Sequence, residues 1–510
     1  MRKGGLWKSI FCFFVVIPMM WGTTVFAEEI KVPSQYSQIQ PAIDAAAPGD
    51  VILVATGTYV GNLLVQKAIT IKKEKETDHC TIDCGNDGGA VSRGVTFSGA
   101  EASGAVLSGF TITAGNGQGS GNWPGFGGAV LFQNNASATI SDCVISGNTA
   151  DFGGAIACIQ SSPMMSHCVI EDNSAMLGGG VLSFDSSSPT IVACTITNND
   201  ANFGGGIYLD TEASPTIYDC LITNNSATLG GGGIAFFSMC SPSLVYCTLS
   251  GNIVSGGDLG GGGILSYYEC SASITNSILW GNDAVNGPEI YLMGSSIAID
   301  HSDVRVGVES ENIYIDGSSD VEWGQGNIDE DPLFAAEGDY HLSPDSPCID
   351  AGALVDDTPE FDIEGDPRVV GSAPDMGADE FFQEESEQTI DVVIDVKPGC
   401  SQNKINLKSW GLLPVAVKTT KDFNVRDIDP GTVEFAGARP VWRMCYDVDR
   451  DRDKDMLLFF RIKSLDLGEN SAEATLTGKT KEGKSFTGKD KVTIEKPKCK
   501  AKAWRFGKRR

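Results

Sequence analysis

Short runs of alternating apolar and polar residues recur along the middle of the chain at a nearly constant interval. One copy reads SPTIVACTITNNDANFGGGIYL, from Ser188 to Leu209, and its neighbours read SPMMSHCVIEDNSAMLGGGVLS and SPTIYDCLITNNSATLGGGGIAF. The segments TIVACTI and GGIYL alternate with period two, which is the spacing of a β-strand. Each copy is rich in Gly, Ser, Thr, Asn and β-branched residues. The pattern therefore predicts several short strands per copy and argues against helical repeats.

Two columns of this repeat keep the same residue type. A cysteine recurs at intervals of 25, 26, 26 and 27 residues, and an asparagine follows each cysteine five positions later. The cysteines are Cys143, Cys168, Cys194, Cys220 and Cys247, and the asparagines are Asn148, Asn173, Asn199, Asn225, Asn252 and, after Ser277 in the cysteine position, Asn282. Repeats of this length that each hold a few short strands stack into a parallel β-helix.

Stacking gives each column a physical role. Coils lie about 4.8 Å apart, so equivalent residues sit directly over one another. We expect the cysteines to form a buried apolar stripe and to stay reduced, because a disulfide needs its β-carbons nearer to about 3.8 Å. We expect the asparagines to form an amide ladder through a tight turn. The glycines Gly204 to Gly206 are expected where the chain turns a corner close to the next coil.

The repeat also resembles a known group of proteins. The element GGAI (Gly153 to Ile156), paired with ISGN (Ile145 to Asn148), is similar to the repeats of right-handed β-helix proteins, both polymorphic outer-membrane-protein-like and pectate-lyase-like. The segment Gln38 to Asn62 resembles their entry, a short capping helix and a first strand, and Asp329 to Gly352 with Asp362 to Phe381 resembles their ending. This resemblance implies a fold over roughly residues 30–382 and implies no activity.

The whole chain is accordingly predicted to be all-β, with a right-handed parallel β-helix solenoid followed by a small β-sandwich. Residues 1–27 have the basic start, apolar run and Val-Phe-Ala site of a secretory signal peptide, so we expect a secreted or cell-surface protein. Residues 28–382 form the β-helix, closed by a helix near Gln38–Ala47 at one end and by Asp329–Phe381 at the other. A linker (383–389), the sandwich module (390–498) and a basic tail (499–510) complete the chain. No later stretch is apolar for long enough to span a bilayer.

Charge is distributed very unevenly. Between Glu76 and Val396 there are 46 acidic residues against three arginines and no lysine, whereas from Lys397 onward 26 basic residues face 15 acidic ones. The acidic part repels nucleic acid and anionic membranes. We therefore expect no nucleic-acid partner; the partner expected from the aromatic residues described below is a polysaccharide or cell-surface glycan.

One segment of the sandwich module has the pattern of a metal-binding loop. In DVDRDRDKD, aspartates occupy alternate positions, as oxygen ligands do in Ca²⁺-binding loops. The predicted Ca²⁺ ligands are Asp447, Asp449, Asp451, Asp453 and Asp455. Arg452 stands where such loops need glycine, so a surface strand of mixed charge is the alternative interpretation.

The repeats contain few residues that could act as a catalytic base or as a positive charge. A polysaccharide lyase must abstract a proton beside a uronate carboxylate, which needs a base and a neutralising cation. The weak candidates are His167, next to Asp142 in the neighbouring copy, and Arg305. A His beside an Asp on a solvated sheet is more often surface decoration than a catalytic pair, so the sequence favours a protein that is not an enzyme.

Aromatic residues on the glycine-led strands point to a different use. Alternation places several outward, where they would form a stripe suited to the faces of sugar rings; these are Phe184, Tyr208, Phe237, Tyr267 and Tyr291. A loop or the sandwich module covering the stripe is the equally weighted alternative. We therefore predict an exported β-helix scaffold that binds an extracellular or cell-surface glycan or mediates adhesion. The alternative function is that of a Ca²⁺-dependent polysaccharide lyase or related glycan-active enzyme.

Overall fold

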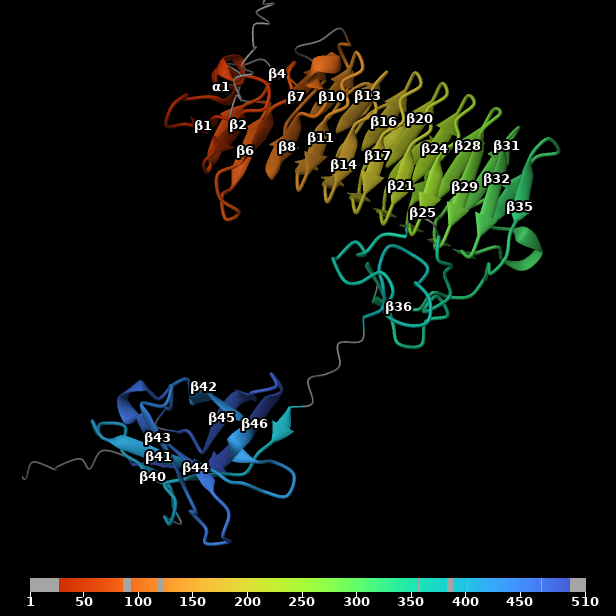
Figure 1. The fold of residues 1–510 in the computed structure, drawn as a ribbon. Coiled ribbons are helices and arrows are strands. Elements are labelled where there is room, and N and C mark those ends of the chain that lie inside the picture. The colour runs from red at the N-terminus through yellow and green to blue at the C-terminus, as the bar shows by residue number, and fades with distance from the viewer. Residues whose placement is uncertain are drawn as a thin grey trace, which may run out of the picture. The chain divides into compact units, whose positions relative to one another are not determined.

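The computed structural model describes residues 27–85, 93–117, 123–336, 338–355, 358–382, 389–400, 402–468 and 470–495. Almost all of the predicted signal peptide and linker, and the whole basic tail, lie outside these residues. The chain divides after Phe382 into two compact units (Figure 1). No helix in the described ranges is long and apolar enough to cross a membrane.

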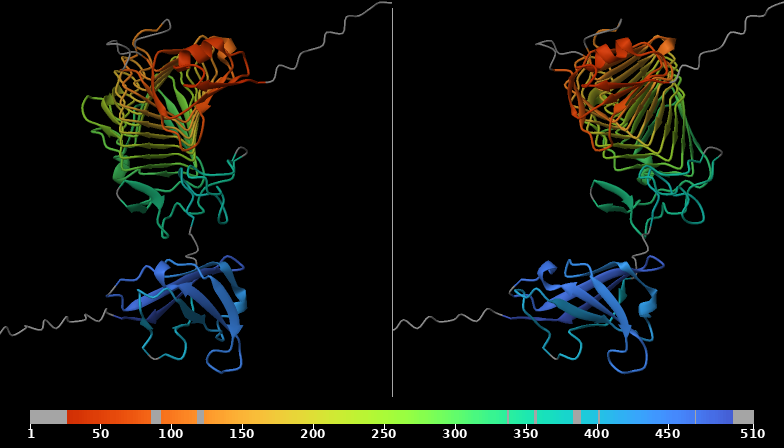
Figure 2. Two further views of the ribbon diagram at one scale, coloured as in Figure 1. Left: turned by 90° about the vertical axis from the view of Figure 1, so that its left-hand side faces the viewer. Right: turned by 60° about the vertical axis from the view of Figure 1, so that its left-hand side comes forward.

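The first unit is a parallel β-helix (Figure 2). Its described residues form three long parallel sheets, of twelve, ten and ten strands. The first sheet runs from β1 (Glu29–Val32) to β35 (Asp320–Trp323), the second from β3 (Gly57–Val60) to β33 (Asp303–Val304), and the third from β4 (Leu63–Val65) to β34 (Ile313–Ile315). Each coil adds one short strand to each sheet, as the sequence predicts.

The course of one coil shows how the repeat is used. The coil that contains the opening phrase contributes β17 (Thr190–Val192), β18 (Thr195–Thr197) and β20 (Ile207–Asp210). The run TIVACTI, read from its alternation as one strand, is divided into two by Ala193, whose φ of 49° is left-handed. Gly204, with φ of 62°, opens the corner before β20, where an added β-carbon would lie 2.3 Å from the Ile207 carbonyl oxygen.

The inward residues of all three sheets make one continuous core. Cys194, Ile196 and Leu209 have no exposed surface and belong to the same apolar cluster. In-register pairing repeats this arrangement, with Ile191 opposite Ile217 and Ile196 opposite Ile222. The predicted cysteine column is buried, and its members are free thiols: Cys143, Cys168, Cys194, Cys220 and Cys247. Burial of each large apolar side chain contributes about 1.5–3 kcal/mol.

The asparagine column forms the predicted amide ladder. The Nδ2 of Asn199 donates to Oδ1 of Asn225 at 3.0 Å, and its own Oδ1 accepts from Nδ2 of Asn173 at 3.0 Å. The same amide nitrogen also donates to the backbone carbonyl oxygens of Ile170 and Thr197. All six asparagines are buried: Asn148, Asn173, Asn199, Asn225, Asn252 and Asn282.

A buried carboxylate ends the ladder. Glu289 has no exposed surface and accepts the Nδ2 of Asn282 at 2.5 Å. It also accepts the backbone N–H groups of Gly281 and Asn282. Burial is the main cause that raises the pKa of this carboxyl from 4.5 to about 7. Glu289 thus supplies the acceptor that a seventh asparagine would have supplied.

The two ends of the β-helix differ from its middle. Helix α1 (Ile39–Ala45) buries Ile39, Ala42 and Ile43 against the first coils, where the sequence places a capping helix. The segment after β35 does not close the opposite end as expected. It packs mainly along the outward face of the second sheet, over β26 (Thr248–Ser250) and β30 (Ile278–Trp280).

The anchor of this side cap is a buried arginine. Arg368 donates to the Asp219 carboxylate at 2.6 Å and lies over the Tyr246 ring at 4.7 Å. The Ala378 N–H donates to the Thr248 hydroxyl, and Ile278 joins an apolar cluster with Leu342, Cys348 and Met376. The outward residues Ile278 and Trp280 of β30 provide the apolar surface on which the side cap packs.

The second unit contains two four-stranded sheets around one core. One sheet has the order β38 (Ile390–Asp391), β46 (Ser485–Lys491), β45 (Glu473–Thr480) and β42 (Ile428–Phe435). The other has the order β39 (Ile394–Val396), β41 (Leu412–Val417), β44 (Asp455–Arg461) and β43 (Trp442–Tyr446). Within these two sheets every pair except β38–β46 is antiparallel, and a separate short pair, β40 (Lys404–Ile405) with β47 (Thr493–Ile494), is parallel. The predicted all-β fold class is confirmed.

The ladder makes a direct prediction for Asn199→Ala. The substitution removes an acceptor for Asn173 and a donor for Asn225 inside the core, so the free energy of unfolding should fall by about 1–3 kcal/mol. Chemical denaturation followed by circular dichroism measures the change. Asn202→Ala is the matched control, because Asn202 is exposed on the same coil. Equal stability of the two variants would contradict the ladder.

Glu289 predicts a pH dependence. Its folded-state pKa of about 7 lies above its ordinary value of 4.5. Its stabilising contribution is therefore complete below about pH 4.5 and is lost as the pH rises through about 7, by on the order of 3 kcal/mol. Denaturation midpoints at pH 5 and pH 8 should differ less in Glu289→Gln than in the parent. The exposed Glu269→Gln should keep the parent's difference.

Candidate functional site

The outward face of the third sheet carries the predicted aromatic residues in two columns. The first column is buried, with Leu182, Tyr208, Leu265 and Tyr291 all at most 6% exposed. Phe152, Leu177 and Phe203, which precede the glycine corners, pack against this column. The second column holds Phe184, Phe237 and Tyr267, which are half-buried.

The exposed stripe is therefore narrower than the sequence predicts. Tyr208 and Tyr291 cannot present ring faces to a sugar, because local loops cover them. Tyr208 instead donates its hydroxyl to Asp210 at 3.2 Å and stacks on Phe237 at 5.3 Å between ring centroids. Phe237 in turn contacts Tyr267 at 5.4 Å. Burial raises the pKa of the Tyr208 hydroxyl, consistent with its position under the loops.

A polar groove adjoins the stripe, and sequence reasoning missed it. It has a volume of about 490 Å³ and is lined by Asn135, Ser137, Gln160, Ser161, Ser162, Asp185 and Ser186. These residues lie in the turns that follow the third-sheet strands, and Asp185 directly follows Phe184. Asn135, Gln160, Asp185 and Ser186 all have positive φ. The sequence does contain a sign of this groove, because a short polar run follows each of three successive glycine-led strands. The runs are NN at 134–135, QSS at 160–162 and DSSS at 185–188.

The polar groove offers hydrogen-bonding side chains but no positively charged ones. The Gln160 amide donates to Asp185 at 2.6 Å, leaving a row of amides, hydroxyls and carboxylates along the groove. Further acidic side chains, Asp210 and Glu212, occupy the next coil. Neither lysine nor arginine occurs between Arg93 and Arg305. The surface can therefore bind hydroxyl groups and repels polyanions.

The weak catalytic candidates are not brought together. His167 and Asp142 are exposed on left-handed turns of neighbouring coils, and Asp142 accepts a hydrogen bond from Ser108. Within the described residues, no hydrogen bond or ion pair joins the two side chains. Arg305 follows β33, five strand spacings from β15 (Val169–Glu171), which is about 24 Å. It lies 5.7 Å from the Trp280 ring centroid.

The remaining arginine of the early coils has a structural environment. Arg93 is 1% exposed and donates to the backbone carbonyl oxygens of Gly117, Trp123 and Phe126. Burial lowers its pKa to about 10. It fixes the loop before the first glycine corner and faces no solvent.

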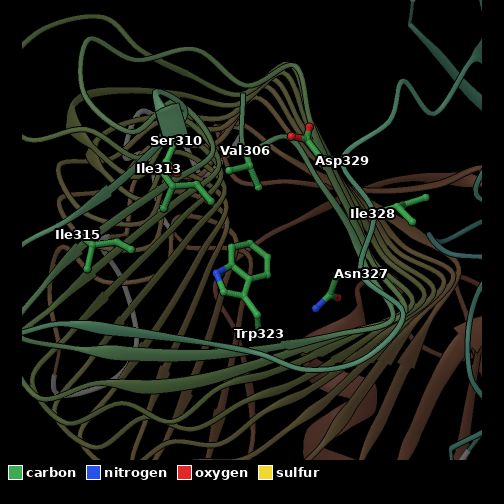
Figure 3. A pocket seen from close by; sticks show the side chains of 8 residues that line it. All are labelled: Val306, Ser310, Ile313, Ile315, Trp323, Asn327, Ile328 and Asp329. Atoms are coloured by element: carbon green, nitrogen blue, oxygen red, sulfur yellow. The ribbon is translucent and has the colours of Figure 1, made fainter. Parts of the chain in front are cut away.

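The C-terminal end of the β-helix contains an apolar pocket. It measures about 250 Å³ and is lined by Val306, Ser310, Ile313, Ile315, Trp323, Asn327, Ile328 and Asp329 (Figure 3). Trp323 and Ile315 are each 44% exposed there. The pocket is the uncovered end of the core, because no further coil stacks on β34 and β35.

The acidic segment forms the loop between β43 and β44. Asp455 is buried and accepts the backbone N–H groups of Thr419 and Val448. Carboxylate oxygens of Asp447, Asp449 and Asp455 converge within 4.8 Å, as do those of Asp449, Asp451 and Asp453. Lys418 pairs with Asp449 at 3.3 Å.

Two features of this loop bear on cation binding. The Oδ1 of Asp453 is buried without a hydrogen-bond partner in the described part of the chain, and desolvation raises the Asp453 pKa to about 6. Arg452, at the position where a calcium loop has glycine, has a φ of 84°, and Arg450 has a φ of 70°. The backbone thus adopts the tight turn despite the residue that argued against it.

The comparisons with known proteins agree with the stacked coils. The family model described as right handed beta helix region matches residues 80–313. The first unit of this chain is therefore a right-handed β-helix.

One solved structure matches the chain at low sequence identity. The crystal structure of pectate lyase Pel9A matches with a TM-score of 0.42 and 14% sequence identity, covering 70% of this chain and 98% of that one. No curated protein matches the sequence. At this identity the likeness concerns the fold, so any site in the β-helix repeat protein is argued from its own residues.

Proposed function

We propose that this β-helix repeat protein binds an uncharged extracellular glycan along the outward face of the third sheet and does not cleave it. The observation that carries the proposal is a polar groove that begins beside the half-buried ring of Phe184, with the rings of Phe237 and Tyr267 two and three coils further along the same face. Phe184 ends β16 (Val181–Phe184), and the next residue, Asp185, lines the groove. Sugars present apolar ring faces and hydroxyl edges, which match these two surfaces.

The electrostatics of the face favour a neutral ligand. Asp185, Asp210 and Glu212 lie along neighbouring coils without a lysine or arginine to balance them. A polyuronate would bring further carboxylates to this surface and would be repelled. A lyase also needs a base and a cation at one sugar unit, and the coil places His167 and Arg305 about 24 Å apart. These features support binding over the alternative of a polysaccharide lyase.

We also propose that the loop of residues 447–455 binds Ca²⁺ and that this ion stabilises the second unit. The converging carboxylates and the unpartnered Oδ1 of Asp453 support the proposal. The ion would neutralise carboxylates that otherwise repel each other across the loop. Adhesion or attachment at a cell surface is consistent with a protein whose second unit depends on an extracellular ion.

The glycan proposal predicts specific losses of binding. Phe184→Ala and Tyr267→Ala should each weaken association with a neutral glucan, galactan or arabinan by roughly two- to tenfold, the loss of one stacking contact of about 0.5–1.5 kcal/mol. Gln160→Ala should also weaken glycan binding, because it removes an amide that lines the polar groove. Titration calorimetry measures these changes, and Phe361→Ala, which removes an exposed ring in the side cap, is the matched control.

The same glycans, together with polygalacturonate, test whether the protein cleaves its ligand. His167→Ala and Arg305→Ala should bind like the parent, and polygalacturonate should bind more weakly than the neutral glycans. An unsaturated product absorbing in the ultraviolet, or new reducing ends, lost on substituting His167 or Arg305, would establish the enzyme alternative instead.

The calcium proposal predicts a shift in thermal stability. Millimolar Ca²⁺ should raise the melting temperature of the second unit because the ion binds the folded state. EDTA should reverse the shift, and the double variant Asp449→Ala, Asp451→Ala should lack it. The control is Asp429→Ala, an exposed aspartate on β42. A melting curve that is the same with chelator and with Ca²⁺ would exclude the site.

A further inference from the structure

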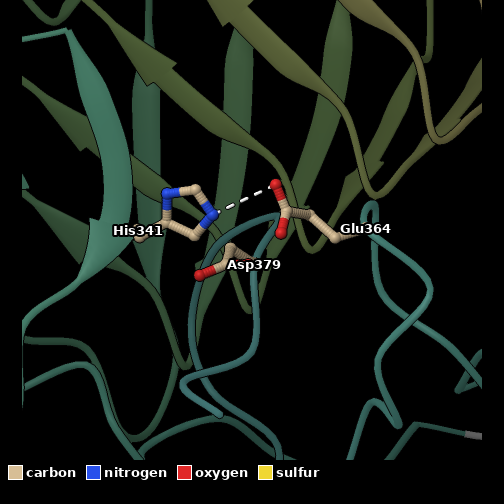
Figure 4. A group of neighbouring side chains, drawn as sticks. All are labelled: His341, Glu364 and Asp379. Carbon is tan, nitrogen blue, oxygen red and sulfur yellow. Dashed lines mark ion pairs between the residues drawn. The ribbon is translucent and has the colours of Figure 1, made fainter. Parts of the chain in front are cut away.

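Three separate segments of the side cap bring potential metal ligands together. His341 lies on β37 (Asp339–Leu342), Glu364 in the turn that follows Asp362, and Asp379 in the last segment before Phe382. One ligand atom from each residue lies within 4.8 Å of the others (Figure 4). His341 Nε2 is 3.1 Å from Glu364 Oε1.

The imidazole of His341 is oriented by a second carboxylate. Its Nδ1 hydrogen-bonds Asp339, two residues earlier on the same strand. This contact turns Nε2 toward Glu364. Metal-binding histidines commonly have this arrangement, in which an outer carboxylate fixes the ring and increases the basicity of the ligating nitrogen.

Asp379 supplies an independent observation. The residue is 9% exposed, and its carboxylate has neither a hydrogen bond nor an ion pair with any described residue. Desolvation raises the pKa of this carboxyl to about 7. His341 and Arg368 act on this carboxylate through charge alone, without a hydrogen bond. A bound cation would supply the direct contact that the carboxylate lacks.

The space between the three side chains suits a single ion. It has a volume of about 30 Å³, enough for one water-sized occupant, and its other walls are Leu221, Tyr340 and Ile363. Leu221 belongs to the coil itself, on β22 (Leu221–Thr223). The cluster therefore lies where the side cap meets the second sheet.

We propose that His341, Glu364 and Asp379 bind one divalent cation of the Zn²⁺ class. One imidazole nitrogen and two carboxylates suit Zn²⁺ and neighbouring transition metals, whereas Ca²⁺ takes oxygen ligands. Three protein ligands leave a position for water at the open side, where His341 and Glu364 are exposed. The ion would fasten three segments of the side cap to one another, at the place where the cap contacts Leu221 of β22.

Zn²⁺ binding to the purified full chain tests this site directly. Excess Ca²⁺ is included so that the acidic loop of the second unit is occupied. Titration calorimetry and metal analysis after dialysis should find one Zn²⁺ per chain, and Zn²⁺ should raise the melting temperature of the first unit. Asp379→Asn and His341→Ala should each lose this equivalent. Asp345→Asn, an exposed aspartate of the same cap, should retain it.

A variant of the orienting residue separates metal binding from simple ion pairing. Asp339→Asn keeps the three ligands and should weaken Zn²⁺ binding by about 10–100-fold. If His341 instead serves only as a cation paired with the carboxylates, the parent will retain no Zn²⁺, and that result overturns the proposal. The proposal is also overturned if Asp379→Asn retains as much Zn²⁺ as the parent. Because asparagine is nearly isosteric with aspartate, Asp379→Asn tests the site even if His341→Ala does not fold.

Discussion

In-register stacking of equivalent residues at about 4.8 Å is the constraint on which this structure depends. A residue that suits one coil must also suit contact with its own copy above and below. Asparagine satisfies this rule because its amide is donor and acceptor at once, so Asn173, Asn199 and Asn225 bond to one another without a different partner. Isoleucine and cysteine satisfy it as apolar side chains of modest size.

The same constraint explains where the column ends. A ladder of identical amides leaves an unused donor at one end and an unused acceptor at the other. Glu289 accepts the donor of Asn282, and the Gly115 N–H donates to Oδ1 of Asn148. Repetition therefore creates a requirement for two unlike residues at its boundaries, and both are buried polar groups of the kind that the core otherwise excludes.

The features that depend on the repeat could be predicted from the sequence, and those that depend on contacts between distant segments could not. The period and the two columns specified the coil, the ladder and the buried cysteines. The burial of Tyr208 escaped prediction because Phe203, before the glycine corner, folds back over it, and alternation alone carries no information about that loop. His341, Glu364 and Asp379 have no common spacing, so only the folded cap shows them together.

The one-sided attachment of the cap has a consequence for the length of the protein. Arg368 binds Asp219, and the other described contacts of the cap fall on the same coil or on later ones. Coils before Asp219 contact only their neighbours, through the same pairing in each case. A whole unit such as residues 174–199 can therefore be deleted or duplicated there. Deletion would bring Asn173 next to Asn225 in the ladder, and duplication would place two copies of Asn199 between them. The outward face of the third sheet would thus lengthen or shorten in steps of one coil, while the side cap stays unchanged.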